Sequence, residues 1–140
     1  MNGWLRVLNA ACLAVVLCIG GYYVFLEPPF LTYPNLPFPV LTPKVKHGDA
    51  VQLDVRRCNS DTKTRVYGLA HSLVGETVTI LLPAMPTSLP PGCAQAVSVI
   101  NVVPQGTPPG TYHIKGYAEV QGTLRTFSIP WRSAPFEVVK

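Results

Sequence analysis

The chain has 140 residues, of which 48% are hydrophobic and 13% charged, and its formal net charge is +4 at pH 7. This length is enough for one modest hydrophobic core and excludes two full-sized domains. After residue 43 there are ten Lys and Arg against six Asp and Glu, spread along most of the chain. We therefore expect no nucleic-acid partner.

The N-terminal segment is an apolar run. Among the 20 residues from Val7 to Leu26, Asn9 is the only strongly polar one, and a helix of this length spans about 30 Å, the thickness of a bilayer core. Arg6 precedes the run, and Glu27 is the first charge after it. The positive-inside rule then places the N-terminus in the cytoplasm and the rest outside it. We predict a membrane anchor over residues 1–26, with residues 4–26 in lipid.

A cleaved signal peptide is the alternative for this segment. Small residues at Cys18 and Gly20 follow an apolar core and could present a cleavage site. The apolar character continues from Tyr22 through Leu26, beyond the length of most signal cores, and this favours the uncleaved anchor. Cleavage after Gly20 would instead release a secreted or virion-associated structural β module.

A proline-rich segment follows the apolar run. Six prolines among the 17 residues from Glu27 to Pro43 disfavour a helix and favour polyproline II. Residues 27–43 are therefore predicted to form a stiff stalk, which could lift the next domain by up to about 50 Å. The segment is also apolar, so two alternatives remain open for residues 36–41. They form the first strand of the domain, or they lie in the groove of a partner or a neighbouring copy.

Residues 44–140 have the pattern of an all-β domain. Short runs rich in Val, Ile, Leu and Tyr alternate with Gly and Pro turns, and no helical periodicity follows Leu26. Val51, Leu53 and Val55 alternate with polar residues, as in a half-buried antiparallel strand. We predict strands near residues 50–55, 64–73, 76–82, 95–103, 111–120, 123–129 and 136–139.

Three stretches of this domain resemble an immunoglobulin-like or fibronectin type III-like sandwich. KHGDAVQLDV (46–55) resembles the entry into its second strand, PPGTYHIKGYAEV (108–120) resembles its sixth strand, and TLRTFSIPWRSAPFEVV (123–139) resembles a broken last strand. The resemblance implies a small antiparallel sandwich over residues 44–140, with Tyr112 as the corner tyrosine. No tryptophan lies between Cys58 and Cys93, so the inter-sheet disulfide of true immunoglobulin domains is not implied.

Cys58 and Cys93 are the only cysteines after the apolar run. A domain outside the cytoplasm meets an oxidising compartment, so we expect these two residues to form a disulfide. The chain-entropy model gives such a link a stabilisation of about 3 to 4 kcal/mol. Cys12 and Cys18 are expected to act as small apolar residues of the helix.

No ionisable residues have the spacing of a known catalytic, cofactor or metal site. His47, His71 and His113 lie on three separate segments without a nucleophile motif around them. We predict no catalytic, cofactor-binding or metal-ligating residue and expect the protein not to be an enzyme. The alternative is a small cell-wall-active enzyme that uses His113 with Glu119 or another neighbour in space.

The candidate partner-binding residues are Trp131, between two prolines, and the basic residues Arg56, Arg57 and Arg65. The sequence favours a core or rim position for Trp131 and a solvated strand end for the arginines, with partner binding as the alternative for both. We expect a single-pass membrane-anchored binding or accessory protein. It would present its domain to a protein partner or to a second copy of itself.

Overall fold

The computed structural model describes residues 3–140, apart from the side chains of residues 100 and 101. The chain begins with helix α1 (Gly3–Gly21), which continues as a π-helical turn over Tyr22–Leu26. Together they form an apolar helix of 24 residues with a mean hydropathy of 2.0. The predicted apolar helix is therefore present, and it is long enough to cross a bilayer. A signal sequence meets the same criteria.

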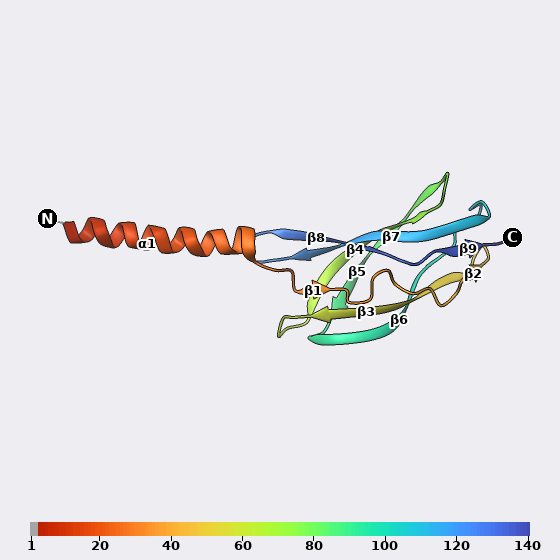
Figure 1. The fold of residues 1–140 in the computed structure, drawn as a ribbon, viewed down its shortest axis with the longest axis horizontal. Coiled ribbons are helices and arrows are strands. Elements are labelled where there is room, and N and C mark those ends of the chain that lie inside the picture. The colour runs from red at the N-terminus through yellow and green to blue at the C-terminus, as the bar shows by residue number, and fades with distance from the viewer. Residues whose placement is uncertain (1–2) are drawn as a thin grey trace.

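After the helix, nine described strands form two sheets (Figure 1). The smaller sheet has the order β1-β3-β6, and the larger has the order β2-β9-β7-β4-β5, with β8 also paired to β7. The strands are β1 (Leu31–Thr32), β2 (Lys44–Val45), β3 (Ala50–Asn59), β4 (Arg65–Val74), β5 (Thr79–Leu89), β6 (Gly92–Val102), β7 (Gly110–Gln121), β8 (Thr126–Arg132) and β9 (Phe136–Val138). The expectation of a β domain is confirmed as a two-sheet, sandwich-like arrangement.

The hydrophobic core comes from the alternation of side chains along the strands. In β7, every second residue from Tyr112 to Val120 is buried, and in β3 the buried residues include Val51, Leu53 and Val55. Both strands therefore have one face toward the core, as the alternation predicts. Removing these side chains from water is the main stabilising contribution to such a fold.

The strand bounds differ most at β5. The sequence predicts a strand that ends at residue 82, whereas β5 continues across Pro83 and Pro86 to Leu89. Proline is tolerated there because β5 lies at the end of its sheet and, among the strands of residues 3–140, pairs with β4 alone. A central strand would have lost ladder hydrogen bonds at both positions.

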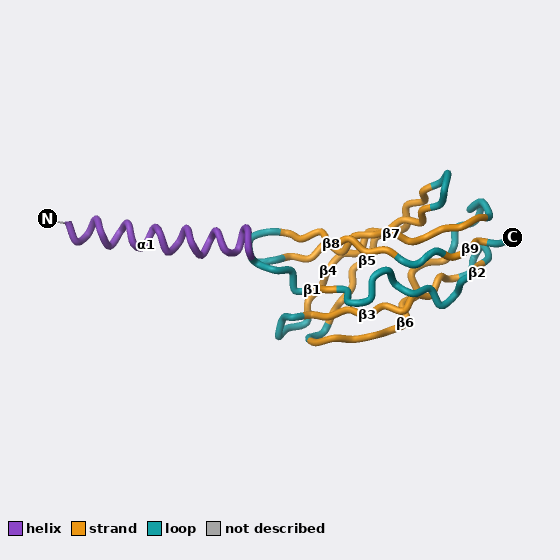
Figure 2. Tube along the Cα trace, viewed as in Figure 1, coloured by secondary structure: helices purple, strands orange, loops and turns teal. Residues whose placement is uncertain are grey.

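The prediction of an extended, stiff stalk over residues 27–43 is wrong. Figure 2 shows this segment as a loop, with the short strand β1, that follows β3 instead of extending away from the domain. Phe30, Leu31 and Phe38 are only 9%, 1% and 2% exposed and belong to the core. The segment packs on its own domain because its apolar side chains have a surface on which to bury.

Backbone hydrogen bonds hold this segment in place. The N–H of Phe38 donates to the carbonyl of Arg132 at 2.9 Å, and the N–H of Asp54 donates to the carbonyl of Pro39 at 2.9 Å. Leu31 and Thr32 pair with the end of β3. The helix is therefore followed directly by the domain, with no extended spacer between Leu26 and the first core residue, Phe30.

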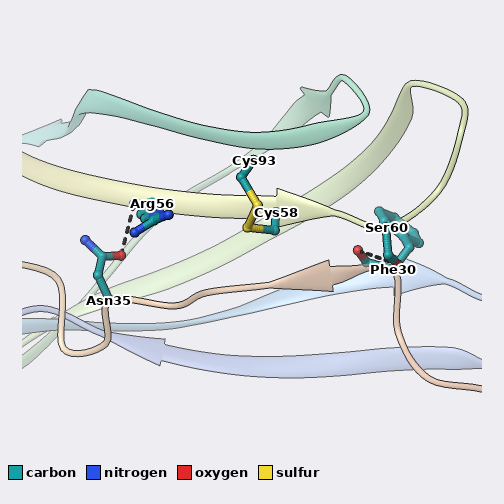
Figure 3. The surroundings of a disulfide bond; sticks show 6 residues. All are labelled: Phe30, Asn35, Arg56, Cys58, Ser60 and Cys93. Carbon is teal, nitrogen blue, oxygen red and sulfur yellow. Dashed lines mark hydrogen bonds between the residues drawn. A yellow bond between two sulfur atoms is a disulfide. The ribbon is translucent and has the colours of Figure 1, made fainter.

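The predicted disulfide between Cys58 and Cys93 is present, with an S–S distance of 2.03 Å. The two cysteines lie directly opposite each other in β3 and β6 (Figure 3). The bond therefore joins neighbouring strands of one sheet, unlike the inter-sheet bond of true immunoglobulin domains. It ties β6 to β3, its sheet neighbour among residues 3–140.

Candidate partner-binding surfaces

Trp131 is a core residue. It lies in β8 and is 3% exposed, with its ring centroid 5.7 Å from that of Phe38 and 6.0 Å from that of His71. Its neighbour in β7 is Gly116, which in turn pairs with His71 in β4. The indole thus fills the space above a glycine inside the sandwich. The expectation that Trp131 anchors a partner at the surface is wrong for this arrangement, and the core alternative holds.

Arg57 also contacts a buried side chain. Its Nη1 donates a hydrogen bond of 3.2 Å to the hydroxyl of Tyr67, a residue that is 3% exposed. Tyr33 lies beside Tyr67, and burial raises the pKa of the Tyr33 hydroxyl well above its usual value. The three side chains form a polar cluster under the packed proline-rich segment. Arg57 therefore satisfies a buried hydroxyl, which a residue of a solvated patch would not do.

Arg65 and Arg56 do not belong to this polar cluster. The Nε of Arg65 lies 2.6 Å from Oδ2 of Asp61, and its guanidinium lies 5.4 Å from the ring centroid of Phe30. The hydrogen bond from Arg65 holds the pKa of the Asp61 carboxyl below its usual value. Arg56 is exposed on the outer face of β3. The three predicted arginines therefore do not form one basic surface.

The histidine and carboxylate of the enzyme alternative are far apart. His113 and Glu119 lie six residues apart in the same strand, β7, which separates them by about 20 Å at about 3.3 Å per residue. This distance is far beyond hydrogen-bond reach. Within residues 3–140, no three His, Cys, Asp or Glu side chains are grouped closely enough to hold a metal ion.

The hairpin between β7 and β8 holds the end of the helix. The carboxylate of Glu27 accepts hydrogen bonds from the backbone N–H of Thr123 (3.0 Å to Oε2) and from the Thr123 hydroxyl (2.6 Å to Oε1). Arg125 donates to the carbonyl of Glu27 at 2.8 Å. Figure 1 shows this hairpin directly beside the end of α1. The sequence alone gives no sign of this contact, because Glu27 and Thr123 are 96 residues apart.

Several exposed apolar side chains of the domain lie on the strands where both sheets end. The last strands of the two sheets, β5 and β6, are joined through residues 90 and 91, and we call this region the open side. Its exposed side chains are Leu81 (84%), Met85 (37%), Val97 (57%), Val99 (58%) and Val102 (54%). On the outer face of the larger sheet, Leu81 and Tyr117 line a hollow of about 490 Å³.

The open side was not among the predicted binding residues. One signal was present in the sequence, since no charged residue occurs between Cys93 and Val103. A strand that faces water on one side usually carries polar residues at every second position. The alternation alone could not indicate that this uncharged run lies at the end of a sheet.

Comparisons with known proteins give only distant structural likenesses. No protein-family model and no curated protein sequence matches the chain. A Pseudomonas fluorescens alkylpurine DNA glycosylase bound to DNA gives a TM-score of 0.49 at 12% identity, over 80% of this chain and 31% of that one. A CARDB domain of a Pyrococcus furiosus protein in complex with di-metal ions gives 0.46 at 18% identity, over 82% of this chain and 97% of that one.

A third likeness is to the neutral ceramidase of Pseudomonas aeruginosa, with a TM-score of 0.41 at 17% identity, over 83% of this chain and 22% of that one. This chain therefore spans less than a third of the glycosylase and of the ceramidase. All three TM-scores are below 0.5.

Proposed function

We propose that this protein is a single-pass membrane-anchored, non-enzymatic binding or accessory module. Its immunoglobulin-like domain stands directly on the outer surface of the bilayer and offers its open side to a protein partner. The observation that carries the proposal is the exposure of Val97, Val99 and Val102, between 54% and 58%, along the uncharged edge strand β6. Apolar surface gathered in this way typically marks an interaction site.

Two features support the immunoglobulin-like part of the proposal. The hydroxyl of Tyr112 donates a hydrogen bond of 2.8 Å to the carbonyl of Pro108, four residues upstream, which is the contact of a tyrosine corner. The division of the strands between the two sheets also agrees with an immunoglobulin-like sandwich. β1, β3 and β6 form one sheet, and β5, β4 and β7 are neighbours in the other.

The anchor and its side of the membrane rest on two further features. The apolar helix has no buried residue, so its side chains are available to lipid. The disulfide between Cys58 and Cys93 requires an oxidising compartment, which supports a domain outside the cytoplasm. An intact mass that begins at Met1 would agree with an anchor, whereas one that begins at Gly21 would contradict it.

Site-specific photo-crosslinking in the native membrane tests the binding function. A photoreactive amino acid would replace Leu81 in one variant and Val97 in another, and the exposed Glu137 of β9 in a control. We expect one defined protein to be joined at Leu81 or Val97 and not at Glu137. Equal crosslinking from all three positions, or from none, would contradict a partner on the open side.

A further inference from the structure

Strand β6 has a neighbour on one edge only. It pairs with β3, and within residues 3–140 no strand pairs with its other edge. The remaining sheet edges are blocked or short. β1 and β2 have two residues each, β5 contains Pro83 and Pro86, and β8 contains Pro130. Short edges and prolines are common ways to prevent pairing with other chains. β6 has neither a proline nor a charge from Cys93 to Val102.

The hydrogen bonds of β3 show which groups of β6 are free. The backbone groups of Gln52, Asp54 and Arg56 bond away from β6, to the segment that contains Asn35 and Leu41. Figure 3 shows one of these bonds, from the N–H of Arg56 to the side chain of Asn35. The alternate residues of β3 therefore bond to β6, because backbone groups along a strand point to its two edges in turn.

This alternation assigns every residue of β6 to one edge. Leu53, Val55 and Arg57 lie opposite Ser98, Ala96 and Ala94, so these three residues of β6 bond to β3. Their neighbours direct their backbone N–H and C=O groups to the free edge. These neighbours are Cys93, Gln95, Val97 and Val99. The short Cα–Cα distance of 4.0 Å between Cys58 and Cys93 agrees with a pair that exchanges no backbone hydrogen bonds.

The inner face of β6 carries a small, exposed residue. Ala96 lies opposite the buried Val55 and shares its inward direction, but Ala96 is itself exposed. Across the open side, Met85 lies opposite Leu69 on the inner face of the larger sheet and is 37% exposed. The end strand of each sheet therefore carries on its inner face an exposed residue that is small or only partly covered.

We propose that β6 accepts an extended, uncharged segment of a partner protein as an added strand. The segment hydrogen-bonds to the free groups of Cys93, Gln95, Val97 and Val99. Its inward side chains are large and apolar and reach toward Met85, while its outward ones lie beside Val97 and Val99. This inference rests on the proposed binding function and names the chemistry of the partner. The absence of charge on β6 favours a segment that is itself uncharged.

A second copy in the same membrane does not fit this edge. Figure 1 shows β3 and β6 running along the same long axis as α1. Antiparallel pairing of two β6 strands needs a two-fold axis perpendicular to them, which would place the two helices at opposite ends of the pair. A two-fold axis parallel to β6 would keep the helices together. It would, however, turn the sheet of the second copy over, so that the inner faces of the two sheets would point in opposite directions. Neither symmetry allows two β6 strands to pair between copies in one membrane, so the occupant that we propose is a different chain.

Amide exchange of the full chain in lipid nanodiscs tests the proposal. The probe is a neutral peptide of about ten residues, close to the 11 residues of β6 and at the upper end of usual strand lengths, in which Val and Ile alternate with Thr and Gln. We expect it to slow the exchange of Cys93, Gln95, Val97 and Val99 by about tenfold or more. The amides that already bond to β3 should not change, and a peptide with alternate N-methylated residues should have no effect.

Variants at one position separate backbone pairing from side-chain contact. Val97→Pro removes an N–H that faces the free edge and breaks no bond to β3, and we expect it to weaken peptide binding by at least about tenfold. Val97→Thr keeps the N–H and the branched shape, and it should bind nearly as well as the wild type. Val97→Lys keeps the backbone intact and repels an apolar strand, so it replaces the proline variant if that protein does not fold.

Three results would overturn the proposal. They are unchanged exchange of all β6 amides, full binding by both Val97→Pro and Val97→Lys, or protection that rises with protein concentration in the absence of peptide. The last result would indicate a second copy. Crosslinking from Leu81 separates this inference from the proposed function. If the Val97→Pro variant still crosslinks to the partner, the proposed function holds and the added strand is wrong. If the peptide protects β6 but no partner is crosslinked, the added strand holds and the proposed function is wrong.

Discussion

The indole of Trp131 occupies the space that a side chain at Gly116 would need. A Cβ added to Gly116 would lie 2.6 Å from Cζ2 of Trp131 and 2.7 Å from the carbonyl oxygen of Ala70. The second contact is with backbone, which cannot move without disturbing the pairing of β4 with β7. Because Gly116 has no side chain, the large ring of Trp131 can pack against the centre of the larger sheet.

Gly116→Ala should therefore lower the free energy of unfolding. We expect a loss of about 1 to 3 kcal/mol, the usual effect of an extra group in a packed core, measured by chemical denaturation. Gly68→Ala in β4 is the matched control, because nothing lies within 4 Å of a Cβ at that glycine. Equal losses in the two variants would show that the contact with Trp131 has no special weight.

Removal of the Glu27 carboxylate should release the hairpin from the helix. Glu27→Ala loses the acceptor of the Thr123 N–H and hydroxyl, and hydrogen bonds to a charged group contribute about 1.5 to 3 kcal/mol when they are well formed. We expect the Thr123 amide to exchange about tenfold faster or more. Glu137→Ala, which removes an exposed ion pair with Lys44, should leave this amide unchanged. Slow exchange in both variants would contradict the contact.

Loss of the disulfide should destabilise the domain strongly. Cys58 and Cys93 are 35 residues apart, and the chain-entropy model gives a loop of this length about 4 kcal/mol of stabilisation. We expect the double variant Cys58→Ser with Cys93→Ser to lose about this amount in chemical denaturation. The corresponding change at Cys12 and Cys18, which are free and exposed on the helix, should leave the stability of the domain unaltered.

His71 should make the domain sensitive to acid. Burial lowers the pKa of His71 below its ordinary value of 6.5, so below about pH 6.5 the unfolded chain binds this proton more readily than the folded domain does. The stabilisation is therefore complete above this pH and is lost as the pH falls. His71→Gln should flatten this part of the dependence of unfolding free energy on pH. Identical pH profiles for the two proteins would exclude His71 as the cause.

Local patterns in the sequence predict a large part of the fold. The apolar helix, the β character of residues 44–140 and the pairing of Cys58 with Cys93 each follow from composition or from short-range alternation. The inward face of β7 is also predictable, because the even-numbered positions from 112 to 120 carry Tyr112, Ile114, Ala118 and Val120, with Gly116 between them. These features need no knowledge of which strands are neighbours.

Long-range contacts explain what the sequence does not predict. The proline-rich segment is packed because β3 and the end of β8 offer backbone groups to Phe38 and Pro39, and no local signal distinguishes this from a free stalk. Trp131 is buried because Phe38 covers it from a distant part of the chain. The free edge of β6 depends on the order of strands in the sheet, which alternation does not specify.

The contact of Glu27 with Thr123 also affects how a partner would be met. A domain on a long flexible tether samples many heights and orientations, and most of them do not present a given strand to a neighbour in the same membrane. Here the helix passes into the domain without a free spacer. With α1 in a bilayer, β6 would keep a nearly constant height and tilt. Encounters with a membrane-bound partner would then be reduced to diffusion in a plane and rotation about one axis.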